Sequence, residues 1–237
     1  MAGFPERPSA WGGLSAILDT PAKRAAAIGV ILVAMAVAPF AFGTYGTVIL
    51  TNALLYVLLA LGLNIVVGYA GLLDLGFAAF FAVGAYTVGI TTLHFGLSFW
   101  LALPLAVLIA IIAGIVIGAP TLRLRSDYLA IVTLGFGEIV RITARNLRET
   151  GGASGLIGID SPWLFGWHIR TPLDFYYVFC VLAILGVIAS ARLANSRLGR
   201  AWLYVRHDED AAEAMGINRV KGKLAAYVVG AIYGSIG

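Results

Sequence analysis

Apolar residues fill long stretches of this chain, and polar residues are gathered in the short segments between them. A helix needs about 20 mostly apolar residues to cross a hydrocarbon core about 30 Å thick. Six stretches meet this length, and we predict membrane-spanning helices at approximately 25–43, 47–67, 75–93, 97–119, 128–146 and 173–191. A seventh apolar stretch begins near residue 224 and is cut off at Gly237, so we expect the sequence to be C-terminally incomplete.

The composition supports the same fold class, an all-α, polytopic transmembrane helical bundle. Hydrophobic residues make up 60% of the 237 residues and charged residues 12%, against about 45–50% and about 25% in soluble domains. The single cysteine, Cys180, can form neither an internal disulfide nor a cysteine-rich metal site. Residues 1–24 lack a cleavable signal pattern, and we assign them as a cytoplasmic N-terminal segment before a retained first helix.

The basic residues predict the orientation of the bundle, because cytoplasmic loops carry an excess of Lys and Arg. With the N-terminus in the cytoplasm, twelve of the 16 basic residues lie on that side: Arg7, Lys23, Arg24, Arg123, Arg125, Arg192, Arg197, Arg200, Arg206, Arg219, Lys221 and Lys223. The outer side then holds Arg141, Arg145, Arg148 and Arg170. This orientation makes the loop 192–223 cytoplasmic and the loop 147–172 external. The basic clusters match topology determinants, so they argue against a nucleic-acid partner.

One polar stretch in the loop 192–223 has the pattern of a short helix. It reads DEDAAEAMG (208–216), and we predict a helix from about His207 to Met215. Asp208 is placed to cap this helix, its alanines are strong helix formers, and Gly216 provides a C-terminal stop. A helix faced with alanine lets another surface approach closely. We therefore predict a docking element for another protein, the alternative being a solvated connector that binds nothing.

The residues around this helix resemble a known family. DAAEAMG (210–216) looks like the coupling loop of ABC importer permeases, in which an acid, two alanines and a glycine form a cytoplasmic helix. The wider stretch 196–218 is similar to the branched-chain amino acid (LIV-type) permeases. Further blocks resemble the same family in the same order, at 68–86, 122–141 and 150–159. The resemblance covers most of residues 47–237.

The resemblance implies a role for the loop and a set of partners. It implies that residues 25–237 form an importer permease domain whose coupling helix docks in a groove of an ATPase subunit. The implied docking residues are Asp210, Ala211, Ala212, Glu213 and Gly216, with Asp210 where the family motif has Glu. The implied partners are two ABC ATPase subunits, a second homologous permease and a substrate-binding protein at the outer face. The implied location is the bacterial cytoplasmic (inner) membrane, as a multi-pass protein in the lipid bilayer.

The resemblance also implies the cargo, which would be leucine, isoleucine or valine, imported by alternating access. Urea and short-chain amide importers have similar permeases and provide an alternative cargo. The glycine-rich stretches of this chain lack the phosphate-binding pattern G-x-x-x-x-G-K-[ST]. We therefore expect ATP and Mg on the partner ATPase subunits, and no cofactor, metal ligand or catalytic residue on this chain.

Polar residues around residues 63–86 are candidates for the transport pathway. Asn64 lies in an apolar stretch, where a hydrogen bond between helices is the simplest role. Asp74 lies between two predicted spans and is surrounded by glycines, which either break a helix or allow close packing. Asp74 is therefore either the cap of the next helix or a polar group at a helix break beside the pathway.

Glu138 and Arg141 form the second candidate group, three residues apart and so on one face of the predicted fifth span. One interpretation is a self-neutralising pair that fixes helix packing, and the other is a polar patch beside the pathway. A rival function follows from this pair. An ion-coupled secondary transporter would use Glu138 and Arg141 as its relay and would have no docking partner at residues 207–216.

Overall fold

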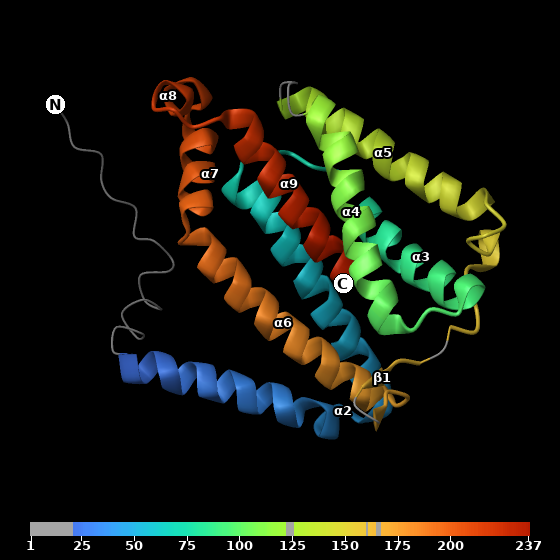
Figure 1. The fold of residues 1–237 in the computed structure, drawn as a ribbon. Coiled ribbons are helices and arrows are strands. Elements are labelled where there is room, and N and C mark those ends of the chain that lie inside the picture. Colours follow the sequence, from blue (N-terminus) through green and yellow to red (C-terminus); the bar gives the residue numbers. More distant parts are fainter. Residues whose placement is uncertain (1–20, 122–125, 160, 165–166) are drawn as a thin grey trace.

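The computed structural model describes residues 21–121, 126–159, 161–164 and 167–237, which form helices joined by loops and one small hairpin (Figure 1). The elements are α2 (Pro21–Leu63), the π-helix η1 (Asn64–Tyr69), α3 (Ala78–Phe95), α4 (Phe99–Thr121), α5 (Ser126–Asn146), the 3-10 helix η2 (Gly152–Ser154), β1 (Trp163–Leu164), β2 (Trp167–His168), α6 (Pro172–Ala194), α7 (Arg197–His207), α8 (Glu209–Ala214) and α9 (Arg219–Ile236). Most of the predicted N-terminal segment lies outside the described residues, as do Arg7, Arg123 and Arg125 of the orientation argument.

The helices confirm the all-α fold class predicted from the apolar stretches. Four helical segments of the described chain are long and apolar enough to cross a membrane: Ala25–Tyr69, Ala78–Phe95, Phe99–Pro120 and Pro172–Ala194. The helices α5 and α9 occupy the places of the predicted fifth and seventh spans, but both carry several charged residues. The count of six spans plus a seventh, and the orientation, stay predictions.

A kink divides α2 close to the boundary that the sequence predicts between the first two spans. Gly43 has φ 63°, a left-handed value that interrupts the helix. One turn earlier, Pro39 has no N–H to donate to the carbonyl of Met35. The Tyr176 hydroxyl of α6 donates to this carbonyl at 2.7 Å. The proline thus frees an acceptor that fixes the N-terminal half of α2 to α6.

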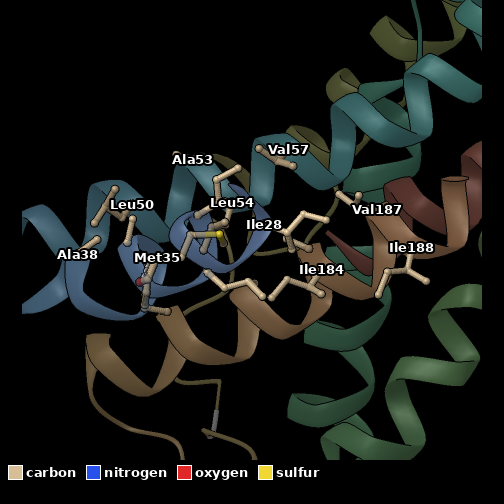
Figure 2. A pocket seen from close by; sticks show the side chains of 15 residues that line it. Ile28, Met35, Ala38, Leu50, Ala53, Leu54, Val57, Ile184, Val187 and Ile188 are labelled. Atoms are coloured by element: carbon tan, nitrogen blue, oxygen red, sulfur yellow. Dashed lines mark hydrogen bonds between the residues drawn. The ribbon is translucent and has the colours of Figure 1, made fainter. Parts of the chain in front are cut away.

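An apolar groove of about 830 Å³ lies between the two halves of α2 and helix α6 (Figure 2). Ile28 and Met35 line it from the first half of α2, Leu54 from the second half, and Ile184 and Ile188 from α6. The walls are almost entirely hydrocarbon, and many neighbouring side chains of α2 are exposed. Such a surface is typical of a helix face that contacts lipid or other apolar helices.

The core of the bundle surrounds α9, which packs against α2, α3 and α4 (Figure 1). Phe80 of α3 lies edge-on to Tyr227 of α9, with ring centroids 5.4 Å apart. Small residues bring the backbones close together: a Cβ added at Gly84 would lie 2.5 Å from the carbonyl oxygen of Ser235. Close approach through small residues is the usual way in which membrane helices associate.

The predicted outer loop, 147–172, contacts helices α3 and α4 and leads into α6. Its Leu156 lies against α3, where a Cβ added at Gly89 would be 2.6 Å from a Leu156 methyl group. The Trp100 indole at the start of α4 donates to the carbonyl of Trp163. Thr171 then caps α6 through a reciprocal capping box with Asp174.

Candidate functional site

The predicted short helix in the loop 192–223 is present as α8, with the predicted start and stop signals. The Asp208 carboxylate Oδ1 accepts hydrogen bonds from the backbone N–H groups of Asp210 and Ala211, both at 3.0 Å. Gly216, with φ 82°, terminates the helix. The predicted start at His207 is wrong by two residues, because His207 is the last residue of α7 and Asp208 turns the chain between the two helices.

Helix α8 presents part of its surface to solvent. Asp210, Ala211, Glu213 and Gly216 are exposed, which makes them available to a partner. Ala212 is different: it is only 1% exposed, so its methyl group faces the chain's own helices. The predicted docking surface is therefore formed by the exposed residues, and Ala212 lies behind it. Sequence analysis did not select Met215, which is 63% exposed beside this surface.

Ion pairs attach α8 to the first turns of α9. Glu209 Oε1 lies 2.6 Å from Lys223 Nζ, and the Lys223 side chain is only 8% exposed. Arg219 contacts two acids of α8, with 3.2 Å to Glu213 Oε2 and 3.4 Å to Asp210 Oδ1. Exposed pairs contribute little, but a buried ammonium group depends on its partner. The helix α8 is thus held to α9 chiefly through Lys223.

The glycine-rich stretch around Asp74 contains a helix break, which we define as residues 64–77. Here α2 passes into the π-helix η1, and residues 70–77 then leave the helix before α3. Gly71 has φ 71°, which only glycine adopts at low cost. The glycines of this stretch both break a helix and allow close packing. Gly71 lies in the break, and Gly76 packs directly on the backbone of Thr133. Asn64 begins η1, and its exposed side chain lies against Gly68.

Asp74 lies in this break and is only 4% exposed. Its Oδ1 accepts a hydrogen bond from the N–H of Gly76 at 2.8 Å, whereas the N-cap position of α3 is Phe77. The predicted cap role is therefore wrong, since Asp74 orders the turn that leads into α3. Asp74 Oδ2 and the Tyr227 hydroxyl are buried without a hydrogen-bond partner, and each lies within electrostatic range of the other. Burial raises the pKa of the Asp74 carboxyl above its ordinary value.

Glu138 and Arg141 form the predicted pair on one face of α5. Arg141 Nε donates to Glu138 Oε2 at 2.9 Å, and a second contact makes the pair bidentate. The two side chains are about half exposed and line a groove of about 390 Å³ between α3 and α5. The pair lies in the same groove as Gly76, close to the helix break. The two charges neutralise each other in this structure, and the packing and pathway interpretations both stay predictions.

These features define a class: a multi-pass helical membrane protein with an interrupted helix near its core and a short helix exposed at one end of the bundle. The chain belongs to the family described as branched-chain amino acid transport system / permease component, which matches residues 45–237. This is a family of transport permeases and not of enzymes.

Comparison with curated proteins gives the same family. The chain is 40% identical to the high-affinity branched-chain amino acid transport system permease protein LivM of Salmonella typhimurium, over 93% of this chain and 57% of that protein. It is 42% identical to the protein of the same name from Escherichia coli, over 86% of this chain and 54% of that protein. A probable LivM of Methanocaldococcus jannaschii is 27% identical over 77% of this chain and 62% of its own length. The chain thus spans somewhat more than half of each relative. No solved structure matches it.

Proposed function

We propose that this chain is part of the membrane permease of an ATP-driven importer that moves branched-chain amino acids into the cytoplasm. The family and the printed names of the relatives support the substrate class. The observation that carries the ATP-driven mechanism is the geometry of α8. This helix is capped, it exposes residues to solvent, and ion pairs attach it to α9, which lies in the bundle core.

In the proposed mechanism, ATP and Mg bind to two partner ATPase subunits, which hold α8 through its exposed residues. Closure of these subunits displaces α8, and the pairs of Lys223 and Arg219 carry the displacement into α9. Because α9 packs on α2, α3 and α4, its movement switches the pathway between outward-facing and inward-facing states. A second homologous permease completes the pathway, and a substrate-binding protein delivers the amino acid at the loop 147–172.

The proposed topology has the N-terminus in the cytoplasm, six spans and a seventh formed by α9, in the bacterial inner membrane. A branched side chain needs apolar room, while its charged ends need polar groups at a break or helix terminus. The break at residues 64–77 and Asp74 are our candidates for this polar region. The mutual pairing of Glu138 and Arg141 leaves no free carboxylate between them, which favours the ATP-driven importer over an ion-coupled transporter.

The test is co-purification of the full-length permease with its ATPase subunits and paired permease in nanodiscs. Ala211→Arg places a bulky charge on the exposed face of α8, and Ala191→Arg makes the same change at an exposed position near the end of α6. We expect the wild type and Ala191→Arg to retain the ATPase, and Ala211→Arg to lose both the ATPase and leucine uptake. An intact complex in which Ala211→Arg binds the ATPase as well as wild type would contradict the docking role of α8.

A further inference from the structure

The Arg206 side chain of helix α7 reaches the helix break. Its guanidinium Nη1 donates a hydrogen bond to the backbone carbonyl of Gly68, a residue 138 positions away in the sequence. The aliphatic part of the same side chain covers Gly71, where an added Cβ would lie 2.7 Å from Arg206 Cγ. Arg206 thus contacts the break at both its π-helical and its unwound part.

The Gly68 carbonyl needs such a donor because the helix ladder is diverted at this point. In an α-helix, the N–H of residue 72 would donate to the carbonyl of residue 68. Here the N–H of Leu72 donates instead to Val66, at 3.1 Å, and the N–H of Ala70 donates to Ile65, at 3.2 Å. A helix end is stable when outside groups satisfy its last carbonyls. The charged Arg206 provides this contact to Gly68, and a charged donor makes a stronger bond than a neutral one.

The other arm of the coupling loop reaches the same break. Helix α9 carries Tyr227, which lies beside Asp74 of the break. The Trp202 indole of α7 donates to the carbonyl of Gly222 of α9 at 2.8 Å, and Trp202 itself is fully buried. Together with the pair between Glu209 and Lys223, this bond joins α7, α8 and α9 at one end of the bundle. A displacement of α8 therefore reaches the break through α7 as well as through α9.

We infer that Arg206 is a positioning residue that ties the movement of α8 to the conformation of the break 64–77. The inference rests on the proposed function, because it concerns how the ATPase subunits act on the pathway. With Arg206 in place, the Gly68 carbonyl follows α7 when α8 is displaced. Without the donor, α8 still binds the ATPase, but the break is released from the loop. ATP hydrolysis then continues while transport is lost.

The test uses the full complex with its substrate-binding protein in proteoliposomes, and measures ATP hydrolysis together with uptake of radiolabelled leucine. The variant is Arg206→Gln. The matched control is Arg200→Gln on the same helix. Arg200 Nη1 also donates to a backbone carbonyl, that of Asn195 at 2.7 Å, but Asn195 lies at the α6–α7 junction and not in the break. We expect Arg206→Gln to retain the ATPase and its hydrolysis while the uptake per ATP falls about tenfold, within the usual range of coupling between sites. Arg200→Gln should match the wild type.

Two further variants separate a coupling role from a merely structural one. Arg206→Lys keeps a charged donor, so it should restore part of the lost uptake per ATP. Arg206→Met keeps an aliphatic side chain over Gly71 but removes the donor to Gly68, so it should lower the same ratio without opening space beside the break. This second variant tests the contact if Arg206→Gln fails to assemble. Normal uptake per ATP in both Arg206→Gln and Arg206→Met, or in Arg206→Met alone if the other does not assemble, would overturn the inference.

A spin label at Leu73, an exposed residue of the break, provides a direct readout. The label is introduced as Leu73→Cys in a background in which Cys180, the one cysteine of residues 1–237, and any other labelled cysteine of the complex are replaced by alanine. We expect ATP with vanadate to change the mobility of the label in the wild type and not in Arg206→Gln. If the label responds equally in both, the inference is wrong while the proposed importer stands. If the wild-type complex binds no ATPase, the proposed function fails, and the inference fails with it.

Discussion

Removing the negative charge of Glu209 tests the attachment of α8 to α9 most directly. In Glu209→Gln the ammonium group of Lys223, only 8% exposed, loses the carboxylate that lies 2.6 Å away. Removing one partner of a buried pair costs about 3–5 kcal/mol, and exposed pairs contribute about 0.2–1 kcal/mol. Because the Glu209 side chain is 46% exposed, we expect a value between these limits, about 2 kcal/mol.

The assay is thermal unfolding of the purified full-length permease, followed by intrinsic tryptophan fluorescence. A loss of about 2 kcal/mol corresponds to a decrease of roughly 4–8 °C in the midpoint for a domain of about 150–250 residues, and to a smaller decrease for the longer full-length permease. Glu213→Gln is the matched control, because its pair with Arg219 is longer, at 3.2 Å, and both of its side chains are well exposed. We expect the control to shift the midpoint by less than about 2 °C.

A second substitution isolates the buried charge. Lys223→Met in the Glu209→Gln background leaves no charge at this position, so most of the lost stability should return. Equal midpoints for Glu209→Gln and Glu213→Gln would refute the reasoning. So would a double variant that is no more stable than Glu209→Gln, since the cost would then arise from something other than an unpaired ammonium group.

Three further substitutions test the break and the packing around it. Burial raises the pKa of the Asp74 carboxyl, so ionisation of Asp74 destabilises the fold as the pH rises through that pKa. We therefore expect Asp74→Asn to raise the unfolding midpoint at neutral pH. Thermal scans between pH 4 and pH 8 should also show that the midpoint of Asp74→Asn depends less on pH than that of the wild type. Gly76→Ala would put a Cβ 2.0 Å from the carbonyl oxygen of Thr133, so we expect size-exclusion chromatography to show little folded protein. Gly29→Ala is the control, because Gly29 has open space around it, and this variant should fold as well as the wild type. Tyr176→Phe loses its bond to the N-terminal half of α2, about 1 kcal/mol, and hydrogen exchange there should increase.

The sequence determined the features that arise from neighbouring residues and from the membrane as a solvent. Long apolar stretches predict helices because a backbone in hydrocarbon has to satisfy its own hydrogen bonds. The short helix α8 was predictable because its cap, Asp208, and its stop, Gly216, act on residues that are at most a few positions away. The pair between Glu138 and Arg141 was predictable for the same reason, since three residues bring two side chains together on one helix face.

Only the tertiary structure decided which side of each element meets another part of the chain. The alanine-rich pattern of α8 did not distinguish Ala212, which turns inward, from the exposed Ala211. The position of Asp74 suggested a cap, yet its carboxylate lies in the break beside Tyr227, a residue of α9. Local rules could not find the bond from Arg206 to Gly68, because 138 residues separate donor and acceptor. Hydrogen bonds within a helix turn depend on local sequence, whereas such distant contacts form only when packing brings their helices together.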